Sequence, residues 1–451
     1  MKAAPNFPSL TRTNIGPVPA HTAAASAAML PLCQRPAVHV DELGAVMSWR
    51  DHMSGLIAQL GDSLEHMDGG PDKAGLLGAL RWVEVLGREA ALGCRSGAGG
   101  ATGGERELDW VLDDVIEAVR VRPESPWEET SWRLLEPRVR TEETRGHDPR
   151  VTWQLRLREP VSQLWEWWER RLKDRVPFQY LISTAHWHKY VLSVGPGVLV
   201  PRPETEIFPE LVRTAISERP YLAAAPWADL GTGSGAIAIA AADELRRVTL
   251  SVEVWAVDLS PRAVAYATFN AQLCLPSPPS TGAGGSGGGG RPLVRVVQGS
   301  WFEPLRHLRG RLGGVLTNPP YIPRAQMSGL QAEVRLHEPR GALDGGEGPG
   351  LDSLEILCSD AAAMMLPGGL IALETAGGDQ AELVAELLRG VREPPSCGAL
   401  DVIDTTASSS TRLNTATMDK NNSTSNSSHS SAGENDAALT RGSVRGLCTE
   451  A

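Results

Sequence analysis

The sequence predicts an α/β protein with a mostly parallel sheet, preceded by a helical domain and a β-hairpin linker. In the second half of the 451-residue chain, short apolar stretches alternate with helical patterns, which is typical of parallel strands joined by helices. In the first half, apolar residues recur at three- and four-residue spacing, which places them on helix faces. We therefore expect a helical domain over residues 41–175, the linker over 176–202 and the sheet domain over 203–404.

The first forty residues differ in composition from the rest. No acidic residue precedes Asp41, whereas Lys2, Arg12 and Arg35 carry positive charge and Ser and Thr are frequent. This composition is typical of an organellar transit peptide. A disordered segment rich in Pro and Ala is the alternative. We expect a transit peptide over 1–40.

Four apolar helix faces are expected in the helical domain. They are Val46, Trp49, Met53, Leu56, Ile57 and Leu60; Leu76, Leu77, Leu80 and Val83; Trp110, Val111, Val115 and Val119; and Val161, Leu164, Trp165, Trp168 and Leu172. A Gly-rich loop at 97–104 separates the second face from the third, and Pro160 suits the first position of the last helix. The tryptophans at 165, 167 and 168 can be interpreted as a stacking platform. Core packing is favoured, because Trp165 and Trp168 fall on the apolar face.

The linker is expected from an extended, aromatic and β-branched segment, Phe178 to Val200, broken by Gly195-Pro196-Gly197. In the sheet domain we expect strands at 227–230, 252–257, 294–297, 315–317 and 370–374, and helices at 237–245, 263–270 and 354–365. Low-complexity sequence interrupts this pattern at 277–291 and from 405 onward. Such sequence buries too little apolar surface to become ordered, so we expect both segments to be mobile.

Charge and cysteine usage exclude several classes of protein. The net charge of −11 argues against stable binding of a nucleic acid backbone, which requires clustered Lys and Arg. The six cysteines form no C-x-x-C pair, so neither a metal site nor a disulfide framework is indicated. No apolar run approaches the roughly 20 residues that cross a membrane. We expect a monomer that acts on a protein or a small molecule.

A glycine-rich loop, Asp229-Leu230-Gly231-Thr232-Gly233-Ser234-Gly235, closes one expected strand and opens a helix. Glycines let the backbone turn tightly and present N–H groups to a ligand. The spacing is G-x-G-x-G, whereas dinucleotide sites have G-x-G-x-x-G. This favours S-adenosylmethionine over NAD, with residues 231–235 as cofactor contacts. A tight structural turn is the alternative.

Asp258 ends the next expected strand, where an acidic side chain can accept hydrogen bonds from both ribose hydroxyls of such a cofactor. Helix capping is the alternative role. Ser260 suits capping better, because Ser260-Pro261 opens the following helix.

The tetrapeptide Asn318-Pro319-Pro320-Tyr321 follows a later strand and predicts the reaction. A planar amide nitrogen is a poor nucleophile, so the site has to position it. The Asn318 side-chain carbonyl and the Pro319 backbone carbonyl can accept its N–H groups, the prolines fix φ, and the Tyr321 ring can pack on the planar group. We predict Asn318, Pro319 and Tyr321 as catalytic residues and all four as substrate-binding. A bare turn is the alternative.

Together these residues resemble the HemK/PrmC family of glutamine N5-methyltransferases, in the family's order, over about residues 177 to 375. The resemblance rests on the glycine loop, on Asn318 to Tyr321 and on further motifs. These are Phe178-Gln179-Tyr180-Leu181, the Pro201–Glu206 hairpin within Val198 to Glu206, Ala256 to Ser260, Gly299 to Leu305, His337-Glu338-Pro339 and Ala342 to Gly346. The Pro201–Glu206 element is the specific one, since Asn-Pro-Pro-Tyr also occurs in methyltransferases that act on adenine and guanine amino groups.

The resemblance implies a class I S-adenosylmethionine-dependent methyltransferase fold. It implies that Gly231 to Gly235, Asp258, Trp301 and Asn318 contact S-adenosylmethionine. It also implies that Asn318 to Tyr321 hold the glutamine of a Gly-Gly-Gln motif in a class I peptide-chain release factor, which the helical domain engages. Gly299 to Pro304 resembles the plant and algal organellar branch. We therefore expect the chloroplast stroma, with the mitochondrial matrix as the alternative.

The chain departs from the family at its end. The family ends with a pair of strands. Here Leu400–Ile403 is followed by low-complexity sequence, and Asp436 to Gly446 resemble the second strand of that pair only weakly. Residues 405–451 are therefore either a low-complexity tail or an insertion before a last strand.

Two other functions remain open at this stage. One is an enzyme that methylates an amino group of adenine or guanine in nucleic acid, which flips the base into its pocket. The other is a protein that docks on a release factor without methylating it.

Overall fold

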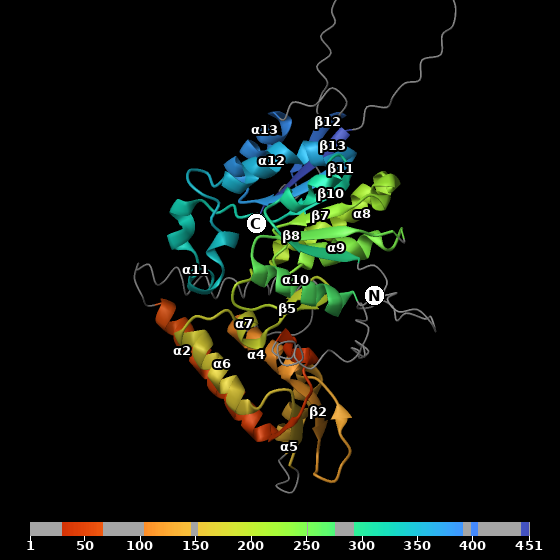
Figure 1. The fold of residues 1–451 in the computed structure, drawn as a ribbon. Coiled ribbons are helices and arrows are strands. Elements are labelled where there is room, and N and C mark those ends of the chain that lie inside the picture. The colour runs from red at the N-terminus through yellow and green to blue at the C-terminus, as the bar shows by residue number, and fades with distance from the viewer. Residues whose placement is uncertain are drawn as a thin grey trace, which may run out of the picture. The chain divides into compact units, whose positions relative to one another are not determined.

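The computed structural model describes residues 29–65, 103–145, 152–249, 251–275, 293–390, 398–404 and 443–450. The chain divides into two compact units (Figure 1). The first comprises Met1–Pro203 together with Gln326–Ala342, and the second comprises Glu204–Ala325 and Leu343–Ala451. The prediction of a disordered transit peptide over 1–40 was wrong for its last residues, because Leu32–Gln34 forms the 3-10 helix η1 and strand β1 begins at His39. Leu32 is fully buried, so this stretch belongs to the folded unit. The part of that prediction before residue 29, the helix face at 76–83 and the insertion at 277–291 lie outside the described residues.

The first unit combines helices with a four-stranded antiparallel sheet of order β1-β4-β2-β3. Its strands are β1 (His39–Glu42), β2 (Ile116–Arg120), β3 (Glu128–Glu129) and β4 (Gln154–Leu157). Its longer helices are α2 (Leu43–Glu65), α4 (Gly103–Val115), α5 (Trp132–Arg145) and α6 (Val161–Lys173). In β4, Leu155 and Leu157 are buried and alternate with the half-buried Gln154 and Arg156. This is the period-two pattern of a strand with one buried face. The unit is therefore not purely helical, in contrast to the prediction.

Three further expectations in this unit were wrong in detail. The helix face expected through Val119 ends at Val115, and Val119 lies in β2. Among the three clustered tryptophans, Trp167 and Trp168 are buried, whereas Trp165 is 37% exposed. Trp168 meets Phe178 edge-on with ring centroids 5.6 Å apart, so core packing holds for the cluster although the buried pair differs from the predicted one. Pro160 caps α6 instead of occupying its first turn.

The expected linker begins with one helical turn, α7 (Phe178–Ile182), and continues into a two-stranded hairpin of β5 (Ala185–Trp187) and β6 (Tyr190–Leu192). The Trp187 Nε1–H donates to the Arg202 carbonyl at 2.8 Å, which ties the hairpin to the segment that follows it. That segment is not a hairpin, because Pro203–Ile207 forms the 3-10 helix η2. Gln326–Ala342 adds α11 (Ala332–His337) and η6 (Arg340–Ala342) to the unit.

The second unit is built on a seven-stranded sheet of order β12-β13-β11-β10-β7-β8-β9, in which every pairing is parallel. The strands are β7 (Trp227–Leu230), β8 (Val254–Asp258), β9 (Val294–Gln298), β10 (Leu312–Thr317), β11 (Met365–Thr375), β12 (Gly398–Asp404) and β13 (Ser443–Glu450). The predicted mostly parallel sheet is confirmed. In a parallel sheet all carboxyl ends lie at one edge, where ligands bind in such folds.

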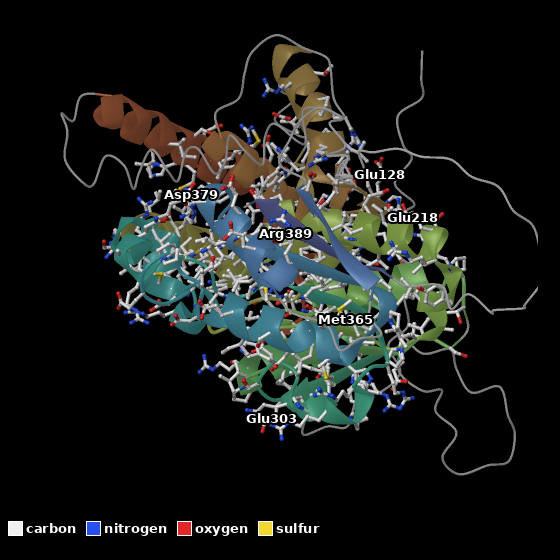
Figure 2. The ribbon with its side chains drawn as sticks, turned by 90° about the horizontal axis from the view of Figure 1, so that it is seen from above. Glu128, Glu218, Glu303, Met365, Asp379 and Arg389 are labelled. Carbon is white, nitrogen blue, oxygen red and sulfur yellow. The ribbon has the colours of Figure 1, made fainter. Side chains whose placement is uncertain are left out.

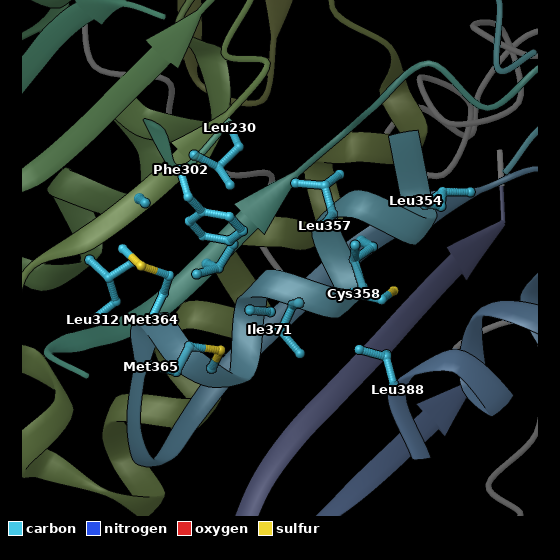
Figure 3. Close-up of a cluster of buried hydrophobic side chains, with 14 of the residues drawn as sticks. Leu230, Phe302, Leu312, Leu354, Leu357, Cys358, Met364, Met365, Ile371 and Leu388 are labelled. Carbon is cyan, nitrogen blue, oxygen red and sulfur yellow. The ribbon is translucent and has the colours of Figure 1, made fainter. Parts of the chain in front are cut away.

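Helices cover both faces of this sheet (Figure 1). They are α8 (Phe208–Glu218), α9 (Ala236–Leu245) and α10 (Pro261–Cys274) on one face, and η4 (Glu303–Leu308), α12 (Asp352–Met364) and α13 (Gly378–Gly390) on the other. Figure 3 shows the core of the second face, where Leu357 and Cys358 of α12 pack with Ile371 of β11. Burying such side chains stabilises the fold by about 1.5–3 kcal/mol each.

The sequence left open whether residues 405–451 are a tail or an insertion before a last strand. The structure places β13 between β11 and β12, paired with both in parallel register. The described sheet therefore keeps a last strand. The low-complexity sequence that joins β12 to β13 lies outside the described residues.

Charged side chains mark the ends of α13 in Figure 2, with Asp379 in the first turn and Arg389 in the last. This placement complements the helix dipole. Within the described residues, no helix is both long enough and apolar enough to span a membrane.

Candidate active site

The glycine loop leaves β7 in a conformation that only glycine adopts without strain. Gly231, Gly233 and Gly235 have φ values of 72°, 55° and 85°, in the left-handed region that a Cβ disfavours. A Cβ on Gly235 would lie 3.1 Å from Cα of Ala267 in α10, so this glycine also allows two helices to approach closely. The loop ends at Gly235, and α9 begins at the next residue.

Asp229 anchors the loop from within the sheet. Its Oδ2 accepts hydrogen bonds from the Thr232 hydroxyl at 2.6 Å and from the Ala238 N–H at 3.0 Å. The side chain is fully buried, and this desolvation raises its pKa to about 7. Ser234 is buried as well, and its carbonyl accepts from the side chain of Asn270 at 2.9 Å. Because the Thr232 hydroxyl is held by Asp229, the loop offers a ligand mainly backbone groups.

Asp258 stands at the carboxyl end of β8, beside the glycine loop. Its Oδ2 accepts from the Gly233 N–H at 2.9 Å, and its Oδ1 accepts from the Ser260 N–H at 2.8 Å. Burial raises the pKa of this carboxyl, and the backbone hydrogen bonds oppose the shift. Ser260 caps α10 through its side chain, as predicted. A carboxylate has about four acceptor positions, so Asp258 keeps capacity for ligand hydroxyls.

Asn318 and Trp301 lie close to the glycine bend. Leu230 pairs with Thr317 across neighbouring strands, and the Thr317 hydroxyl donates to the Leu230 carbonyl at 2.6 Å. A Cβ on Gly231 would be 3.4 Å from the Trp301 ring and 3.8 Å from the backbone carbonyl oxygen of Asn318. The structure thus brings together the predicted cofactor loop, the predicted tryptophan and the first residue of the predicted substrate tetrapeptide.

Tyr321 is held by a residue that the sequence did not single out. Its hydroxyl donates to Oε1 of Glu374 at 3.0 Å, and Glu374 is fully buried near the end of β11. Because β10 and β11 are neighbours in the sheet, their carboxyl ends bring these side chains together. The sequence feature that could have identified Glu374 is its position as an acidic residue at the end of the predicted strand 370–374.

These residues fit S-adenosylmethionine. At Gly231 the bare backbone lies beside the Trp301 ring, where a Cβ would come within 3.4 Å, and a Cβ on Gly233 would meet nothing within 4 Å, so the loop leaves room for a ligand. Asp258 supplies carboxylate oxygens that can accept from ribose hydroxyls. In the described part of the chain, no group of three or more His, Cys, Asp or Glu side chains could hold a metal ion.

The sequence of this chain is similar to those of several known enzymes. The chain is 42% identical, over 235 residues, to the release factor glutamine methyltransferase of Gloeobacter violaceus, a match that covers 52% of this chain and 73% of that relative. The chain belongs to the release factor glutamine methyltransferase family. The members of this family from Synechocystis and Thermosynechococcus vestitus are each 40% identical, over 52% and 49% of this chain and 73% and 69% of their own lengths. No protein-family model matches the chain.

Membership of this family, together with the parallel sheet, identifies a class I methyltransferase fold with S-adenosylmethionine as its cofactor. Both predictions are confirmed.

Proposed function

We propose that this enzyme transfers a methyl group from S-adenosylmethionine to the side-chain amide nitrogen of a glutamine in a peptide-chain release factor. The observation that carries the proposal is the proximity of Asn318 to the glycine bend: the backbone carbonyl oxygen of Asn318 lies 3.8 Å from a Cβ built on Gly231. The names of the relatives agree with this activity. The glutamine is that of the Gly-Gly-Gln motif, as the family resemblance implies.

S-adenosylmethionine supplies a methyl group on a cationic sulfur, which is open to attack by a weak nucleophile. The task of the protein is to hold the amide nitrogen in line with that methyl group. In the proposed mechanism, the Asn318 side-chain carbonyl and the Pro319 backbone carbonyl accept the two N–H groups of the glutamine. Positive charge develops on the nitrogen as it reacts, and these carbonyl dipoles stabilise that charge before a proton leaves for solvent.

The tetrapeptide is suited to this role because it is rigid. Two prolines fix φ at consecutive positions, Pro319 is buried, and the Tyr321 hydroxyl is bonded to Glu374. Orientation of reacting groups is worth up to roughly 7–11 kcal/mol of a reaction barrier. A rigid pair of acceptors therefore contributes more than the strength of two hydrogen bonds.

The test is methylation of purified plastid and mitochondrial release factors side by side. Mass spectrometry should find one added methyl group on the Gly-Gly-Gln peptide. Asn318→Ala should lower kcat by about 100-fold, in the range found when one stabilising dipole is removed. Glu218→Gln, on the exposed surface of α8, should retain full activity. Absence of methylation on both factors, or transfer to nucleic acid in its place, would contradict the proposal.

We further propose that the substrate is an organellar release factor and that the enzyme works in the chloroplast stroma, with the mitochondrial matrix as the alternative. The acid-free composition before Asp41 supports this, as does the resemblance of Gly299 to Pro304 to the plant and algal organellar branch. A fluorescent protein fused behind residues 1–40 should accumulate in chloroplasts. Uniform fluorescence in the cytosol would count against the organellar assignment.

A further inference from the structure

Gln380 lies in the first turn of α13, directly after the carboxyl end of β11. The side chain is only 6% exposed. Its Oε1 accepts from the Ala376 N–H at 2.7 Å. Its Nε2 donates to the Tyr321 carbonyl at 2.8 Å and to the Pro349 carbonyl at 2.6 Å. One carboxamide, with two N–H groups and a carbonyl, thus joins three separate segments of the chain.

The segments that Gln380 joins are packed too tightly to move independently. A Cβ on Gly345 would lie 2.7 Å from the Tyr321 carbonyl carbon, and a Cβ on Gly350 would lie 2.5 Å from the Tyr321 carbonyl oxygen. Gly345 also donates through its N–H to the Ile322 carbonyl at 2.8 Å. The glycine turn at 345–350 therefore lies directly against the backbone of the substrate tetrapeptide.

We propose that Gln380 is a positioning residue for methyl transfer. It fixes the orientation of the peptide group after Tyr321 and thereby the direction in which the acceptor groups of Asn318 and Pro319 point. This inference rests on the proposed function. Only a side chain that both donates and accepts can make these contacts, which excludes an ionised carboxylate or a thioether. A displacement of about 1 Å in such a constellation costs roughly 100-fold in rate.

The first test uses Gln380→Met, which keeps the length and most of the volume of the side chain but lacks the amide. We expect kcat to fall at least about 10-fold, as two hydrogen bonds of ordinary strength predict. The KM for the release factor and the Kd for S-adenosylhomocysteine should stay within about twofold, because Gln380 is not among the predicted contact residues of either ligand. The matched control is Glu382→Gln, an exposed change on the same helix, which should leave kcat unchanged.

The second test uses Gln380→Glu and its pH profile. An ionised carboxylate cannot donate to Tyr321, whereas a protonated one can donate a single hydrogen bond. The activity of this variant relative to wild type should therefore rise as the pH is lowered. Parallel profiles for variant and wild type would overturn the inference, because a purely structural role gives no such gain.

The third test does not depend on activity. The Ile322 and Arg324 N–H groups donate to the Leu343 and Gly346 carbonyls at 2.9 and 2.8 Å. Their hydrogen exchange should be faster in Gln380→Met and unchanged in Glu382→Gln. If the wild type methylates glutamine while the Gln380 variants keep both kcat and slow exchange, the inference fails and the function stands. If the wild type does not methylate glutamine, the proposed function fails, and exchange alone decides whether Gln380 holds the tetrapeptide.

Discussion

The Gly233 N–H donates to Oδ2 of Asp258 at 2.9 Å, so the acidic residue at the end of β8 holds the middle of the glycine loop. The carboxylate that is expected to bind the ribose therefore also fixes the shape of the loop beside it. Because the Ser260 N–H donates to Oδ1 of the same carboxylate, both oxygens are already oriented. The glycine loop and this carboxylate are thus held in one fixed arrangement at the predicted cofactor site.

Replacing Asp258 by Asn should weaken binding of S-adenosylhomocysteine about 10- to 100-fold, since a hydrogen bond to a charged group is worth roughly 1.5–3 kcal/mol. Because burial raises the pKa of Asp258, wild-type affinity should fall as the pH drops through that raised pKa. The affinity of the Asn variant should stay flat over the same range. Titration calorimetry at several pH values measures both effects, and equal affinities would contradict the ribose role.

Asp229 should make the stability of the protein depend on pH. Its folded pKa of about 7 lies above the ordinary value of 3.8, so its contribution to stability is complete below about pH 4. That contribution is lost as the pH rises, at up to about 1.4 kcal/mol per unit, until the pH passes the folded pKa. The free energy of unfolding of Asp229→Asn, relative to wild type, should therefore increase from pH 5 to pH 8. Urea denaturation at each pH tests this, and a constant difference would show that Asp229 is ionised in the folded state.

The loop glycines offer a matched pair of substitutions. Gly235→Ala adds a Cβ 3.1 Å from Ala267 at a positive φ, whereas a Cβ on Gly233, also at positive φ, would meet nothing within 4 Å. Both variants should lose about 1–2 kcal/mol from backbone strain. Gly235→Ala should lose about 1–3 kcal/mol more from overpacking. Thermal unfolding of the two proteins measures the difference. Equal melting temperatures would mean that α10 can shift away from the added methyl group without a loss of stability.

The ion pair between Arg202 and Glu338 should be important for the stability of the first unit. The Arg202 Nη2 lies 2.7 Å from Oε2 of Glu338, whose side chain is 2% exposed. Arg202→Met leaves a buried carboxylate without this cation and should cost about 3–5 kcal/mol. The double variant Arg202→Met, Glu338→Gln should be more stable than Arg202→Met alone. If urea denaturation shows additive losses instead, the two residues do not stabilise each other.

Much of the second unit was predictable from local sequence. The apolar stretches at 227–230 and 294–297 became β7 and β9, and the loop between Leu230 and Ala236 formed the expected bend. These features depend on short-range causes: the period of apolar residues, the freedom of glycine and the capping by Ser260. The first unit was less predictable, because Ile116 to Arg120 can extend a helical pattern as well as form a strand. Its pairing with β4, more than 30 residues away, decides the outcome.

By itself, the sequence determined the parallel sheet, the glycine loop, the placement of Asp258 and Asn318 at strand ends, and the family to which the chain belongs. Tertiary structure alone decided which residues brace them: Glu374 on the Tyr321 hydroxyl, Gln380 on the Tyr321 carbonyl and Asp229 beneath the loop. The reason is physical. The period of apolar residues and the residues that favour turns can be recognised in the sequence alone. The role of a buried polar side chain depends on the group it bonds to, and Tyr321 and Glu374 become neighbours only when β10 and β11 pair.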